Sequence, residues 1–146
     1  MPSMRRQLAI QIPHPPEQVL AALTDFSERR PDRWPMLDRR SYRVHSVGKT
    51  EAEITEGTTS PVGRFWARER YVWSSPGVVT WTVVDSNFCR AGTRIVARVE
   101  PGEGGGTRLD LDWERKPKGW RGAVFAASAV PLIRTFLRRS FQGVRL

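Results

Sequence analysis

Between residues 41 and 115 the chain alternates strand-like segments with short turn sequences, and this pattern constrains the fold most strongly. In residues 107–115, Leu109, Leu111 and Trp113 alternate with acidic residues. Such a period of two is typical of a strand with one buried and one solvated face. Earlier strands are predicted over residues 41–47, 51–58, 64–74, 78–86 and 92–100. Short connections between them favour an antiparallel meander.

The first part of the chain adds one strand and two short helices. Residues 5–12 alternate in the same way, which predicts a strand that ends at Pro13. Pro15 and Pro16 suit the first turn of a helix, where a missing amide hydrogen costs nothing, and helical spacing continues over residues 15–26. Ser27 is placed to cap a second short helix.

The last part of the chain predicts a long helix. From Gly119 onward one stripe is apolar, whereas Arg134 and Arg138 fall on the other side. Pro131 interrupts this stripe and should kink or divide the helix, leaving the Ala127 carbonyl without its usual partner. The predicted fold class is therefore α+β: one domain over residues 1–146, with seven antiparallel strands, two short helices and a long C-terminal helix.

Cysteine content and hydropathy point to the cytoplasm. Cys89 has no partner for an internal disulfide, which favours a reducing compartment, and we expect it to be a small hydrophobe that is buried or half-buried. Gln11 and Pro13 interrupt the N-terminal apolar run before it could form a signal peptide. The longest nearly uncharged stretch, residues 122–133, is much shorter than the roughly 20 residues of a membrane-spanning helix.

The net charge of +9 raises polyanions as partners. All but three of the 24 basic residues are arginine, however, and they are spread along the whole chain without a nucleic-acid-binding motif. We therefore expect a solvated basic surface and no specific nucleic-acid partner. The outer side of the last helix could still support weak association with an anionic membrane. Its basic residues are Arg134, Arg138, Arg139 and Arg145.

One carboxylate falls on the predicted inner face of the sheet. Alternation in residues 64–74 places Glu69 on the same side as Phe65 and Tyr71. Burial there would raise the pKa of Glu69, unless an arginine or a hydroxyl such as that of Tyr71 or Tyr42 satisfies it. Such a group is a candidate acid/base. The alternatives are a structural ion pair, or a one-residue slip in register that turns Glu69 outward.

Several local patterns carry a resemblance to a known family. They are residues 15–19 (PPEQV), 24–26 (TDF), 33–35 (RWP), 92–94 (GTR) and 106–108 (GTR). With the order of the elements, these make the chain resemble the polyketide cyclase/dehydrase and lipid-transport family of the START-like, pollen-allergen-like (SRPBCC) superfamily. The resemblance implies the helix-grip fold, in which a curved sheet and a C-terminal helix enclose a cavity. It covers nearly the whole chain.

The resemblance also implies a function, which is to bind a hydrophobic molecule between sheet and helix. We expect binding or transport of a lipid- or polyketide-like molecule; a fully packed interior is the structural alternative, because cores and cavities use the same residues. The expected wall residues are Trp34, Tyr42, Phe65, Glu69, Tyr71, Trp81, Val83, Trp113, Phe125, Leu132 and Phe136.

Catalysis is the alternative function. Members of the family share no catalytic set that could be transferred, so a cyclase/dehydratase activity would rest on Glu69 with Tyr71 or Tyr42. We favour a binding protein over an enzyme and expect no cofactor. A metal site is not expected either, because His14 and His45 lie in different elements without further ligands at suitable spacing.

Overall fold

A computed structural model describes residues 3–129 and 132–146. Its seven strands form one antiparallel sheet in the order β1-β7-β6-β5-β4-β3-β2, which confirms the predicted α+β class. The strands are β1 (Met4–Ile12), β2 (Arg43–Val47), β3 (Glu51–Ser60), β4 (Gly63–Val72), β5 (Val78–Ser86), β6 (Arg94–Pro101) and β7 (Thr107–Arg115). The helices are α1 (Pro16–Leu23), α2 (Arg30–Arg33), α3 (Gly119–Ala129) and α4 (Ile133–Gln142), with short 3-10 turns η1 (Arg39–Ser41) and η2 (Glu103–Gly105).

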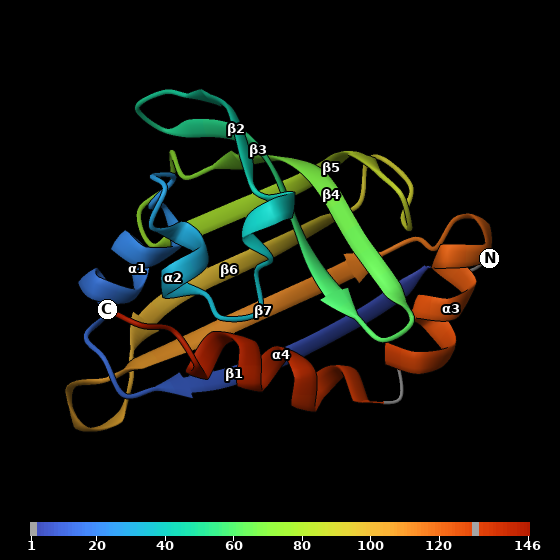
Figure 1. Cartoon of the computed structure of the whole chain (residues 1–146). Helices are drawn as coiled ribbons and strands as arrows, with labels where there is room; N and C mark the ends of the chain where they lie inside the picture. Colours follow the sequence, from blue (N-terminus) through green and yellow to red (C-terminus); the bar gives the residue numbers. More distant parts are fainter. Residues whose placement is uncertain (1–2, 130–131) are drawn as a thin grey trace.

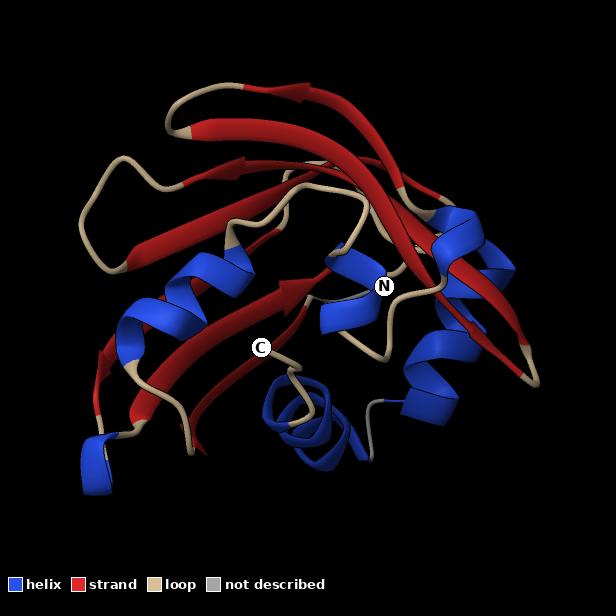
Figure 2. Cartoon of the chain, turned by 60° about the vertical axis from the view of Figure 1, so that its left-hand side comes forward, coloured by secondary structure: helices blue, strands red, loops and turns tan. Residues whose placement is uncertain are grey.

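The sheet curves over the helices (Figures 1 and 2). In Figure 2, α4 is seen nearly end-on beneath the concave face, and it contacts β1. Helix α1 lies against β6 and β7. Alternate residues of the strands point into the space between these layers, as predicted: Leu109, Leu111 and Trp113 of β7 are each less than 5% exposed.

Helix α1 begins where the sequence predicts and ends earlier. Pro16 occupies its first turn, and Glu17 lies where the helix dipole favours a negative charge. The helix stops at Leu23, and the carbonyls of Leu23 and Asp25 accept hydrogen bonds from the Arg30 side chain. Phe26 is therefore outside the helix, buried against Tyr71.

The predicted C-terminal helix is present as two helices, α3 and α4. Residues 130–131 between them lie outside the described residues, and so does the expectation of a bend at Pro131. The buried stripe of α4 contains Ile133 and Leu137, with Phe136 and Phe141 half-buried beside them. None of the helices in the described ranges has the length and apolar character needed to cross a bilayer.

Buried side chains form two hydrophobic clusters. The larger lies between the sheet, α1 and α4, and includes Ile10, Leu23, Trp81, Leu109 and Leu137. The smaller lies under α3, where Val124 and Phe125 cover it. It consists of Phe65, Ala67, Val83, Phe88 and Cys89. Cys89 is fully buried there, as predicted, and burial raises the pKa of its thiol.

Candidate functional site

A cavity of about 500 Å³ lies between the concave face of the sheet and helices α3 and α4. This volume is within the range of about 300–1,000 Å³ that is typical of small-molecule pockets. Most of its wall is apolar and aromatic. Met36 and Val62 are 39% and 49% exposed, so the cavity reaches the surface near the β3–β4 turn.

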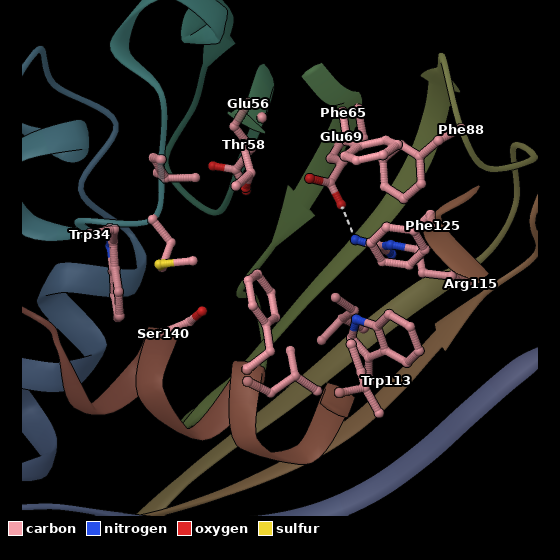
Figure 3. A pocket seen from close by; sticks show the side chains of 18 of the residues that line it. Trp34, Glu56, Thr58, Phe65, Glu69, Phe88, Trp113, Arg115, Phe125 and Ser140 are labelled. Carbon is pink, nitrogen blue, oxygen red and sulfur yellow. Dashed lines mark hydrogen bonds and ion pairs between the residues drawn. The ribbon is translucent and has the colours of Figure 1, made fainter. Parts of the chain in front are cut away.

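Most of the wall residues expected from the sequence do line this cavity. Figure 3 shows Trp34 at one end and an aromatic group with Phe65, Phe88, Phe125 and Trp113 at the other. The rings in this group pack edge-on or tilted, with centroids of Phe88 and Phe125 4.7 Å apart. The expected residues found in the wall are Trp34, Phe65, Glu69, Tyr71, Trp81, Trp113, Phe125 and Phe136.

Three expected wall residues lie elsewhere. Tyr42 follows η1, outside the cavity, and its hydroxyl donates to the carbonyl of Ser27; burial raises the pKa of Tyr42 to about 12. Val83 does face inward, but it is packed within the smaller cluster under α3. Leu132 is 65% exposed, because the inward stripe of α4 starts one residue later at Ile133.

Glu69 projects into the cavity, as the strand alternation predicts, and pairs with an arginine. Its carboxylate accepts a hydrogen bond from Arg115 Nη2 at 2.9 Å, and both side chains are less than 10% exposed. The two residues come from β4 and β7, which are separated by β5 and β6 in the sheet. The curvature of the sheet therefore brings them together across the concave face (Figure 3).

A second polar pair, in which the Glu56 side chain is 12% exposed, lies beside the contact between Glu69 and Arg115. Arg30 Nε donates to Glu56 at 3.1 Å, and Arg30 Nη2 donates to the Tyr71 hydroxyl at 3.0 Å. Tyr71 in turn donates to Glu56. The Tyr71 hydroxyl thus has both a donor and an acceptor partner inside the protein.

Burial determines the proton affinities in this cluster. Burial, which removes hydration from the carboxylate, is the main reason that the pKa of Glu69 rises to about 8; Arg115 opposes this rise, and Glu56 adds to it. Burial likewise raises the pKa of Tyr71 well above its ordinary value, again with help from Glu56. At neutral pH Glu69 therefore tends to hold its proton inside an apolar cavity.

The sequence analysis did not identify Arg30, Glu56 and Arg115 as part of the site. For two of them the strand alternation in the sequence indicates an inward position. Glu56 continues the inward alternation of Ala52 and Ile54, and Arg115 that of Leu111 and Trp113. Ser140 of α4 also lines the cavity, and its hydroxyl oxygen is buried without a hydrogen-bond partner among the described residues. Within those residues no group of three or more histidine, cysteine and carboxylate side chains is arranged to hold a metal ion.

Comparison with known proteins identifies the family. The profile of the polyketide cyclase/dehydrase and lipid-transport family matches residues 4–145. The chain belongs to this family. A search of curated proteins gives no match.

Solved structures share the fold. An aromatase/cyclase (Zhui) from Streptomyces sp. R1128 aligns with a TM-score of 0.77 and 10% identity, covering 97% of this chain and 93% of its own. A START superfamily protein from Mycobacterium smegmatis gives 0.68 and 11%, covering 94% and 97%. A protein from Thermus thermophilus gives 0.67 and 17%, covering 97% and 90%. At these identities the similarity extends to the fold alone.

Proposed function

We propose that this protein binds or transports an apolar small molecule, lipid-like or polyketide-like, in the cavity between the sheet and α4. The cavity itself carries the proposal, because its volume suits such a molecule and its wall is largely aromatic. Aromatic walls provide large apolar contact areas and favourable ring-on-ring geometries. The family description, which includes lipid transport, agrees with this function.

A neutral fluorescent probe tests the proposal. N-phenyl-1-naphthylamine gains fluorescence when it leaves water, and we expect saturable binding to one site. Thr58 lines the cavity, so Thr58→Phe places a ring inside it and should weaken binding about tenfold or more. Thr82 is the matched control. It lies on the outer face of the sheet in β5, away from the cavity, where its strand neighbours are Arg70 of β4 and Arg94 of β6.

The two variants distinguish the cavity from the surface. The proposal predicts that Thr82→Phe keeps the affinity of the unmodified protein. Equal affinities of Thr58→Phe and Thr82→Phe, or a probe signal that never saturates, would contradict it.

A cyclase- or dehydratase-type activity is the second candidate. Glu69 favours it, as a carboxyl group that holds its proton next to an apolar binding space. The positions of the expected tyrosine partners argue against this activity. The Tyr71 hydroxyl is already bound by Arg30 and Glu56, and Tyr42 lies outside the cavity. This candidate requires that the protein dehydrates an aromatic β-hydroxyketone and that Glu69→Gln loses this turnover while it still binds the neutral probe. Absence of turnover above the uncatalysed rate would exclude that reaction.

A weak association with anionic membranes is a further proposal, supported by the surface charge of α4. Arg134, Arg138 and Arg139 are all exposed there, and Arg145 is exposed beyond its end. Basic residues near an anionic surface contribute about 1 kcal/mol each. Such contact would hold the protein close to a source or acceptor of an apolar ligand.

A further inference from the structure

The two arginines in the cavity wall differ in how many of their donors are engaged. A guanidinium group has five N–H donors. Arg30 donates to Glu56, Leu23, Asp25 and the Tyr71 hydroxyl. Its planar group also lies over the rings of Phe26 and Tyr71, with centroid distances of 4.8 and 5.0 Å. Arg30 therefore acts as a fixed structural link.

Arg115 is engaged much less. Within the described residues its Nη2 donates to Glu69, and its Nη1 makes a long bond of 3.3 Å to the Glu114 carbonyl. Its Nε has no partner in those ranges. Nevertheless the side chain is only 8% exposed and lines the cavity. The guanidinium group therefore has donor capacity left for a ligand oxygen in the cavity.

The surroundings of Arg115 define what such a ligand looks like. Arg115 lines the same cavity as Phe65, Phe88, Trp113 and Phe125, and Figure 3 draws these side chains toward the same end of it. A molecule that reaches Arg115 must therefore place its apolar part among these rings. Arginine recognises carboxylate-like groups through two parallel hydrogen bonds, and such charge-assisted bonds are stronger in a site that excludes water.

We infer that Arg115 anchors an acidic oxygen group of the ligand, so that the cavity selects aromatic anions over neutral aromatic molecules. This inference rests on the proposed binding function and specifies its ligand class. Glu69 is the internal competitor, because an ionised Glu69 occupies Arg115 and a protonated Glu69 frees its charge for the ligand.

The charged groups around Glu69 agree with this exchange. Those that face it are Arg115 from β7, Glu56 from β3, Tyr71 from its own strand and the Cys89 thiol. The Glu56 charge is balanced by Arg30. A proton on Glu69, whose pKa is about 8, thus leaves Arg115 as the one uncompensated charge in this group at neutral pH.

A matched pair of probes tests the ligand class. 1-Anilinonaphthalene-8-sulfonate carries the same rings as N-phenyl-1-naphthylamine and adds one permanent negative charge. We expect the sulfonate to bind more tightly at about pH 6.5, and Arg115→Gln to lower its affinity relative to the neutral probe by about tenfold or more. Arg94→Gln removes an equal charge from the outer face of β6, away from the cavity, and should leave that ratio unchanged.

The pH dependence of the affinity ratio of the two probes provides an independent test. The affinity for the sulfonate relative to the neutral probe should decline between about pH 6.5 and pH 9. Above the Glu69 pKa the decline should approach tenfold per pH unit. Glu69→Gln, which cannot ionise, should abolish this decline, and it serves even if Arg115→Gln does not fold.

A ratio that is independent of pH in the unmodified protein, or equal in Arg115→Gln and Arg94→Gln, would overturn the inference. Saturable binding of the neutral probe in that case would leave the proposed function standing. Failure of both probes to bind would instead contradict the proposed function.

Discussion

At the scale of single residues, Arg30 has the most to lose by substitution. Its side chain joins α2 to the end of α1, to β3 and to β4, and it is almost completely buried. We expect Arg30→Ala to lower the free energy of unfolding by about 3–5 kcal/mol, because it removes a buried guanidinium and leaves the half-buried Glu56 without a counter-charge. Arg30→Lys should rescue little, since lysine lacks the planar fork.

Urea unfolding monitored by circular dichroism measures this loss. The neighbouring Arg29 is exposed and serves as the control, with an expected change of about 0.5 kcal/mol or less for Arg29→Ala. Equal effects at the two positions would show that the Arg30 network contributes no net stability.

Glu69 should make the stability of the protein depend on pH. Its pKa rises from 4.5 to about 8 on folding, mainly through burial, so the folded state holds the proton more tightly than the unfolded chain. This contribution to stability is complete below about pH 4.5 and is lost as the pH rises through about 8. The slope is at most about 1.4 kcal/mol per pH unit.

A series of urea titrations between about pH 5 and pH 9 isolates this effect by comparison with Glu69→Gln. The difference in unfolding free energy between the two proteins should shift in favour of the glutamine variant as the pH rises. A difference that stays constant would mean that Glu69 is ionised throughout and that Arg115 outweighs its burial.

Strand alternation predicted part of this polar cluster. Glu69 was placed inside because its neighbours on one face are aromatic. The same alternation places Glu56 with Ile54 and Arg115 with Trp113, yet charged residues are ordinarily solvated. Their pairing could not be derived from spacing, because the contact between Glu69 and Arg115 depends on how strongly the sheet curves.

At the scale of elements, α4 presents two leucines to different environments. Leu137 is 5% exposed in the main core, whereas Leu132 is 65% exposed at the start of the helix. We expect Leu137→Ala to lower the free energy of unfolding by about 2–5 kcal/mol through the lost burial and the void it leaves. Leu132→Ala should change it by about 0.5 kcal/mol or less.

Chemical denaturation of both variants measures this contrast. Similar losses at the two positions would contradict the orientation of α4 on the sheet.

The elements differ in how well their sequence patterns predicted them. Strand β7 and strand β5 have the predicted bounds, because a strict alternation and clear turn residues delimit them. The predicted end of α1, at Phe26, was too late. In the structure the carbonyls of Leu23 and Asp25 bind the Arg30 side chain instead, and no local helix signal in the sequence indicates this contact. Leu132 was assigned to the stripe because one helical phase was assumed across residues 119–142, whereas α3 and α4 are separate helices.

At the scale of the whole molecule, the positive charge predicts salt-sensitive binding to anionic vesicles. Replacing Arg134 and Arg138 by glutamate should reduce co-sedimentation with phosphatidylserine-containing vesicles several-fold, since each residue contributes about 1 kcal/mol at most. Arg94→Glu with Arg98→Glu makes the same charge change on the outer face of β6 and is the control. Equal losses in both pairs, or binding that is insensitive to salt, would attribute the effect to net charge or to apolar contact rather than to α4.

The overall architecture followed from the sequence because seven strands with short connections and terminal helices admit few arrangements. The size of the cavity did not follow, because a filled core and a cavity wall draw on the same apolar residues. Only the positions of Phe65, Phe88, Phe125 and Trp113 around unfilled space distinguish the two.

A crystal structure of the protein grown with N-phenyl-1-naphthylamine tests the central claim most directly, because it shows where an apolar molecule resides. The account predicts density for its rings inside the cavity, among Phe65, Trp113 and Phe125, with the pair of Glu69 and Arg115 at its edge. A cavity closed by side chains, with the probe absent or bound only on the outer surface, would contradict it.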